Sequence, residues 1–208
     1  DLKISSSGIE SLSFPALTRV SGKIKVVGNS SLASLDFSSL VRVGDKSPFT
    51  IHEDLVFENN EALSSIGLTA LVSVGGNLDL GKDPFEGFSN LTSLDLSALQ
   101  IVGATLSIAR NAKLASIDFS SLSSVGDDVI VLRNGALVEL SMPAILNVGG
   151  SFRVGSSSSF DHNDALTSLE LPVLHSVGLD LTIKNPPIKT LSLPSLVSVG
   201  GDLTASVN

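Results

Sequence analysis

Acidic side chains recur at one position of the sequence and are the first candidates for chemistry. Asp95 and Asp118 lie 23 residues apart, and Asp36 and Glu170 occupy the same place in the pattern described below. If these positions stack, carboxylates about 5 Å apart could hold calcium or act as the acid and nucleophile of a glycosidase. The chain has no Trp or Tyr to form sugar platforms. We therefore expect a solvated acidic face and no enzymatic activity, with a calcium site as the alternative.

Two further patterns could bind phosphate or metal. Residues 76–82, GNLDLGK, fit the spacing G-x-x-x-x-G-K of a phosphate-binding loop, but Asp83 stands where that loop needs a hydroxyl residue to hold magnesium. His52, His162 and His175 show no pairing at i, i+4, and the chain has no cysteine to join them in a metal centre. The sequence therefore predicts no cofactor and no metal site.

Composition narrows the class of partner. The 208 residues include 13 Lys and Arg against 21 Asp and Glu, and the formal net charge of −8 repels nucleic acid and anionic lipid. With 42% hydrophobic residues the chain can bury one continuous core, so we expect a single domain over residues 1–208. No run of about 18 apolar residues occurs. This segment is therefore not expected to insert into a membrane, and a signal peptide or an anchor is expected to lie outside it.

A repeat organises the whole sequence, and its most constant residue is a valine that is nearly always followed by glycine. The eight pairs are Val20-Ser21, Val43-Gly44, Val74-Gly75, Val102-Gly103, Val125-Gly126, Val148-Gly149, Val177-Gly178 and Val199-Gly200. The apolar residue eleven places before each valine marks the start of a coil, and the basic unit is 23 residues long. The coils start at Ile9, Leu32, Leu63, Leu91, Leu114, Leu137, Leu166 and Ile188. A fixed period of this length is typical of a solenoid.

Each unit holds two short stretches in which apolar and polar residues alternate, such as Leu94-Asp95-Leu96 and Leu106-Ser107-Ile108. Alternation with a period of two indicates β-strands, and Gly or Pro interrupts every helical pattern. Because such a unit cannot bury its apolar face alone, the units should stack about 4.8 Å apart. The sequence predicts an all-β parallel β-solenoid of about eight coils. The predicted core includes Leu96, Leu106, Ile108 and Val125.

Two recurrent positions are predicted to shape the corners of each coil. The glycine after the valine should permit a backbone turn with positive φ. An asparagine recurs after the second stretch, where stacked side chains should form a ladder of hydrogen bonds. These asparagines are Asn29, Asn60, Asn111, Asn134, Asn163, Asn185 and Asn208.

The consensus L-x-S-L-x-L-P-x-L-x-x-V-G-G-x-L-x-I-x-x-N resembles the repeat of receptor L domains and of fungal GPI-anchored cell-wall proteins. Residues 114–136, LASIDFSSLSSVGDDVIVLRNGA, show it nearly complete, and the resemblance covers essentially the whole chain. It implies a right-handed parallel β-helix at the cell surface, often N-glycosylated, that binds ligands or organises the wall. Such proteins usually carry cysteines at the ends of the fold, whereas this chain has none.

Three insertions interrupt the repeat, and departures of this kind are where a solenoid usually places a binding site. They span residues 47–54, 83–89 and 156–162, and each contains phenylalanine near acids or histidine. Either these phenylalanines fold over the coil edge as lids, or they form the rim of a binding surface. The candidate binding residues are Phe49, His52, Phe85, Phe88, Phe160 and His162.

The leading functional expectation is an extracellular or cell-surface module for recognition or adhesion, with a protein or carbohydrate surface as partner. Two sequons, at Asn29 and Asn90, are predicted glycosylation sites of such a protein. The first alternative is a structural subunit of an extracellular filament or wall layer, because both ends of the sequence match parts of one coil and could stack end to end. The second alternative is a protein that binds an ice or carbohydrate surface.

Overall fold

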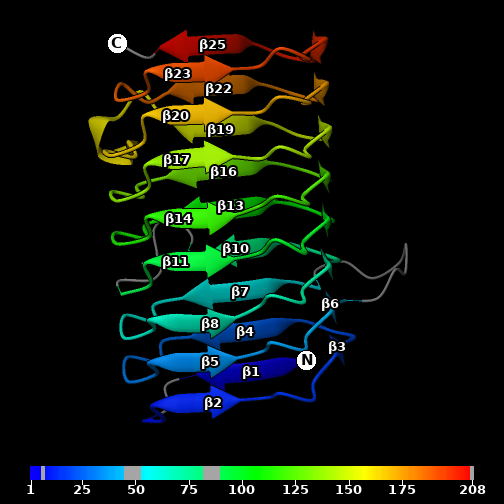
Figure 1. The fold of residues 1–208 in the computed structure, drawn as a ribbon, viewed down its shortest axis with the longest axis vertical. Helices are drawn as coiled ribbons and strands as arrows, with labels where there is room; N and C mark the ends of the chain where they lie inside the picture. The colour runs from blue at the N-terminus through cyan, green and yellow to red at the C-terminus, as the bar shows by residue number, and fades with distance from the viewer. Residues whose placement is uncertain (6–7, 45–52, 82–89, 207–208) are drawn as a thin grey trace.

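The chain winds into stacked coils of short parallel strands (Figure 1). The computed structural model describes residues 1–5, 8–44, 53–81 and 90–206, which contain strands β1 to β25 and one 3-10 helix, η1 (Ser159–Asp161). All recorded strand pairs are parallel, and each joins neighbouring coils, as in β1 with β4. The predicted all-β parallel β-solenoid is therefore confirmed. Within the described residues, no helix is long and apolar enough to span a bilayer.

Two sheets run the length of the solenoid. The long sheet has nine strands: β1 (Leu2–Ser5), β4 (Ile24–Val27), β7 (Leu55–Glu58), β10 (Leu78–Leu80), β13 (Leu106–Ala109), β16 (Val129–Leu132), β19 (Phe152–Gly155), β22 (Leu181–Lys184) and β25 (Leu203–Ser206). The short-strand sheet has eight: β3 (Arg19–Val20), β6 (Arg42–Val43), β9 (Ser73–Val74), β12 (Ile101–Val102), β15 (Ser124–Val125), β18 (Asn147–Val148), β21 (Ser176–Val177) and β24 (Ser198–Val199).

The third face, the segmented sheet, consists of three separate pieces. They are β2 (Ser11–Ser13), β5 (Ser34–Asp36) and β8 (Ser65–Gly67); β11 (Ser93–Asp95) and β14 (Ser116–Asp118); and β17 (Glu139–Ser141), β20 (Ser168–Glu170) and β23 (Thr190–Ser192). Each coil thus has three strands, whereas the sequence predicted two. The strand that was missed holds only the recurrent valine and the residue before it. Two residues are too few for an alternating pattern to reveal a strand.

The apolar residues of all three faces meet in one core. The predicted core residues Leu96, Leu106 and Ile108 are fully buried, and Val125 is 2% exposed. All four belong to a single cluster that runs from coil to coil, so this prediction is confirmed. Because equivalent residues touch those above and below, burial in one coil depends on its neighbours, as expected for a solenoid.

The glycine that follows the valine has a different role from the one predicted. Among the glycines that follow the recurrent valine, only Gly44 has a positive φ, of 90°. A Cβ added to Gly126 would lie 2.1 Å from the carbonyl oxygen of Gly103, and one added to Gly149 would lie 2.1 Å from that of Gly126. The prediction of a positive φ is therefore wrong for most of these corners. Glycine is required there because the backbones of successive coils approach too closely for any side chain.

The predicted asparagine ladder is confirmed in two runs of described coils, and Asn208 lies outside the described residues. The Nδ2 of Asn111 donates to the Oδ1 of Asn134 (3.1 Å), and the Nδ2 of Asn134 donates to the Oδ1 of Asn163 (3.0 Å). Asn163 and Asn185 continue the ladder, and Asn29 and Asn60 form the same contact in the first coils. All of these side chains are fully buried. The ladder therefore supplies the polar backbone at this corner with partners inside the core.

Candidate binding site

Four of the predicted binding residues lie outside the described residues: Phe49, His52, Phe85 and Phe88. Of insertion 47–54 only Glu53 and Asp54 are described, and none of insertion 83–89 is. Insertion 156–162, which contains Phe160 and His162, is described and is called the binding loop below. It is therefore the insertion from which a site can be built.

The aspartates on the segmented sheet cap the turns that follow their strands. Asp95 and Asp118 are register partners on β11 and β14, as predicted. Each accepts the backbone N–H of the residue two places on, Ser97 at 2.9 Å and Ser120 at 2.8 Å. Hydrogen bonds from the side chain and the backbone of Ser97 lower the pKa of Asp95. The described residues contain no group of three or more His, Asp or Glu arranged to hold a metal ion.

The remaining candidate motifs lie within regular coils of the solenoid. In the G-x-x-x-x-G-K segment, Leu78–Leu80 form β10 of the long sheet, which pairs with β7 and β13. A phosphate-binding loop instead needs a helix that presents its N-terminus. His175 is exposed, and its backbone N–H donates to the carbonyl oxygen of Leu146 in the neighbouring coil.

The binding loop leaves the long sheet at a glycine with a left-handed backbone. Gly155 ends β19 with φ of 68°, and an added Cβ would lie 2.2 Å from the carbonyl oxygen of Lys184. Only glycine combines this φ with so close an approach. The loop therefore begins at a fixed point beside β22.

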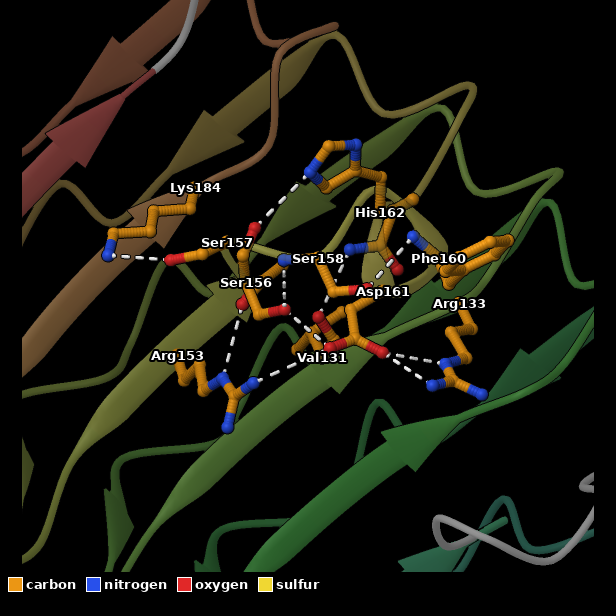
Figure 2. Close-up of polar contacts among 12 residues, drawn as sticks. Val131, Arg133, Arg153, Ser156, Ser157, Ser158, Phe160, Asp161, His162 and Lys184 are labelled. Carbon is orange, nitrogen blue, oxygen red and sulfur yellow. Dashed lines mark hydrogen bonds and ion pairs between the residues drawn. The ribbon is translucent and has the colours of Figure 1, made fainter.

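A carboxylate in the loop ties it to two coils (Figure 2). Asp161 accepts from the Nε of Arg133 at 2.8 Å and pairs with the same guanidinium at 2.6 Å, while Arg153 lies 3.7 Å from its other oxygen. The hydroxyl of Ser156 also donates to Asp161. This hydrogen bond is the main cause of a lowered pKa at Asp161, and the two arginines act in the same direction against the effect of burial. Asp161 thus stays ionised and holds both ends of the loop.

Further hydrogen bonds order the loop internally. Ser158 donates its backbone N–H to the hydroxyl of Ser156 (3.0 Å) and accepts from the N–H of Phe160 (3.3 Å). A ring nitrogen of His162 lies 3.2 Å from the carbonyl oxygen of Ser156. Phe160 itself is 82% exposed. The interpretation of this phenylalanine as a lid over the coil edge is therefore wrong, because its ring covers no core.

A shallow trough crosses the long sheet beside the loop. It consists of two adjoining hollows of about 370 and 330 Å³ that share Ile130 and Arg153. The first is lined by residues of β16, β19 and β22 and by Ser156 and Ser157 of the loop. The second extends the trough toward β13 and β10. The trough therefore runs across the strands, along the axis of the solenoid.

Opposite charges line the two edges of the trough. Arg153 and Lys184 lie beside the loop, where Lys184 donates to the hydroxyl of Ser157 at 3.1 Å. Asp128 and Asp180, which precede β16 and β22, lie at the other edge. Figure 2 shows Arg153 and Lys184 on one side of Asp161, and Phe160 beside Arg133 on the other. The loop thus separates an exposed aromatic ring from a polar trough.

Sequence reasoning identified Phe160 and His162 but missed the charged residues that surround them. Arg133, Arg153, Asp161 and Lys184 come from three coils, and only the strand register shows that they meet. One signal was available. When the repeats are aligned, Arg153 occupies the position of Ile130 and Thr182 in the neighbouring coils. It is therefore a charged residue on the strand that leads into the insertion.

The two predicted glycosylation sites differ in accessibility. The Asn29 side chain is fully buried and donates to the carbonyl oxygen of Ile4 (3.1 Å) and to Asn60 (3.1 Å). A glycan on Asn29 would have to replace these bonds. Asn90 is exposed, donates to the carbonyl oxygen of Glu61 and accepts from Lys113. Of the two, only Asn90 keeps its amide at the surface of the folded chain.

No family model, curated protein sequence or solved structure matches this chain. The binding loop and the trough beside it therefore provide the basis for a functional proposal.

Proposed function

We propose that this chain is a non-catalytic recognition or adhesion module of an extracellular or cell-surface protein, and that the binding loop and the trough form its binding surface. The observation that carries the proposal is the 82% exposure of Phe160 on a loop held by ion pairs. A phenylalanine in that position contributes little to the core. Rigidly held aromatic side chains are typical anchors of protein interfaces.

The ordering of the loop supports the same role. Asp161, Ser156 and Ser158 fix the backbone on both sides of Phe160. A surface ordered before it meets its partner loses less conformational entropy on binding. An extracellular location is supported by the exposed sequon at Asn90 and by the resemblance to the repeats of receptor L domains and fungal cell-wall proteins.

The proposal is tested with a fluorescently labelled chain on arrays of extracellular oligosaccharides and matrix proteins, with Phe160→Ser as the variant. We expect Phe160→Ser to lose at least tenfold in affinity for the bound ligand, since truncating an interface anchor costs about 2 kcal/mol or more. Its unfolding midpoint should stay unchanged because the ring is exposed. Val138→Ser is the matched control, since Val138 is also apolar and 53% exposed but lies in the segment before β17. Equal binding by both variants, or no binding at all, would contradict the proposal.

A further inference from the structure

We propose that the trough binds an oligosaccharide built from uronic acids, with the sugar carboxylates toward Arg153 and Lys184 and the sugar hydroxyls toward Asp128 and Asp180. This inference rests on the proposed function, because it names the ligand class of the same binding surface. The charges at the two edges, the floor between them and the spacing of the coils all fit this ligand class.

The edge beside the binding loop carries two cations on neighbouring coils. Arg153 pairs in register with Thr182, two residues before Lys184 on β22. The Nζ of Lys184 donates to a neutral hydroxyl, that of Ser157. The guanidinium of Arg153 lies 3.7 Å from Asp161, which is held more closely by another arginine at 2.6 Å. Asp161 therefore neutralises Arg153 only in part, and this edge favours an anion although the chain as a whole is acidic.

The opposite edge favours hydroxyl donors. One oxygen of Asp128 accepts the backbone N–H of Ser151 at 2.7 Å, and one oxygen of Asp180 accepts that of Asp202 at 2.9 Å. These bonds fix the carboxylates in place. A carboxylate has about four lone-pair positions, so each retains capacity to accept from a ligand. Repulsion by these two acids directs a ligand's own carboxylate to the far edge.

The dimensions of the trough suit a row of acidic sugars. Lys184 lies four positions after Asp180, which in an extended strand corresponds to about 13 Å between the two edges. The apolar side chain of Ile130 and the hydroxyl-bearing side chain of Thr182 form the floor between the two edges. A uronic acid carries its carboxylate on one side of the ring and vicinal hydroxyls on the other, so one orientation satisfies both edges.

The repeat of the solenoid extends this match along a chain of sugars. Neighbouring coils lie about 4.8 Å apart, close to the length of one sugar unit. Coils carrying β16, β19 and β22 line the first hollow, and the second hollow continues toward β10. A polymer lying along the solenoid axis can therefore place successive sugars over successive coils, with Arg153 and Lys184 facing sugars on neighbouring coils. A neutral polysaccharide would offer no anion to Arg153 and Lys184.

The test uses an oligogalacturonate about three sugars long, one for each coil that lines the first hollow, and the same oligomer fully methyl-esterified. The ester keeps the ring hydroxyls and removes the charge. By isothermal titration calorimetry we expect the acid to bind about ten- to a hundredfold more tightly than the ester, as for hydrogen bonds to a charged group. Added salt should weaken binding of the acid and leave the ester unaffected.

Two lysine variants locate the site. Lys184→Ala should lower affinity for the acid about tenfold or more, whereas Lys189→Ala, which removes an exposed lysine outside the trough, should leave it unchanged. Equal affinity of acid and ester, equal behaviour of the two variants, or no binding of the oligogalacturonate would each overturn the inference. Binding to other arrayed ligands that depends on Phe160 would then leave the recognition function in place. Loss of both would overturn both.

Discussion

Replacing Asn134 by alanine should show how strongly the asparagine ladder holds the coils together. Asn134 is fully buried and its side chain makes four hydrogen bonds. Its Nδ2 donates to the carbonyl oxygen of Ile108 (2.9 Å) and to the Oδ1 of Asn163 (3.0 Å). Its Oδ1 accepts from the N–H (3.3 Å) and the Nδ2 (3.1 Å) of Asn111. The substitution therefore affects three coils at once.

The expected loss of stability follows from these four bonds. A buried hydrogen bond contributes about 1 kcal/mol net, so Asn134→Ala should lower the free energy of unfolding by about 4 kcal/mol. Guanidinium unfolding followed by circular dichroism measures this as a lower midpoint at unchanged slope. Hydrogen exchange gives a local readout, because the backbone N–H of Asn111 loses its acceptor and should exchange faster.

The matched control for this experiment is Asn90→Ala. Asn90 also bonds a backbone carbonyl and a neighbouring side chain, but it is exposed. Its removal should change the free energy of unfolding by less than about 1 kcal/mol. A loss below about 1 kcal/mol for Asn134→Ala, with unchanged protection of the Asn111 amide, would refute the reasoning. The ladder would then be a consequence of stacking and not a source of stability.

Three other substitutions test the core, the glycine corner and the binding loop. Leu106→Ala should lower the free energy of unfolding by about 2 to 5 kcal/mol, measured by chemical denaturation, because it leaves a cavity in the core. Gly126→Ala should cost about 2 kcal/mol or more, since its Cβ meets a backbone oxygen, whereas Gly135→Ala, with no neighbour closer than 3.7 Å, should cost less than about 0.5 kcal/mol. Asp161 has a lowered pKa, so its stabilising effect should be complete above its ordinary value of 3.8 and lost as pH falls through the folded-state value. Asp161→Asn should lose this stability at neutral pH and flatten the acid side of the curve of unfolding midpoint against pH; an unchanged curve would contradict the role of Asp161.

The sequence predicted which residues recur and stack, but it missed the two-residue strand of each coil, the reason for the glycine corner and the contacts of the binding loop. Leu106 and Asn134 repeat with the period, so their stacking could be inferred from spacing alone. The close approach at Gly126 could not, because glycine is compatible both with positive φ and with backbone contact, and only the distance to Gly103 distinguishes them. The site residues were harder still. The role of Asp161 depends on its ion pair with Arg133, which lies one coil away in space but 28 residues away in sequence.

The position of the left-handed residue in each repeat bears on how the chain leaves the coil at the binding loop. In three coils that continue directly to the ladder, a left-handed residue stands immediately before the asparagine: Asn59, Arg110 and Arg133, with φ of 53°, 58° and 59°. At Gly81 and Gly155 it stands one register position earlier, opposite Ala109 and Leu132. These two glycines directly precede residues 82–89 and the binding loop. Because the left-handed turn comes one residue early, the chain leaves the coil before it reaches the ladder, and it rejoins at Asn163 after the loop. The left-handed Gly155 therefore marks the point at which its coil opens into the binding loop.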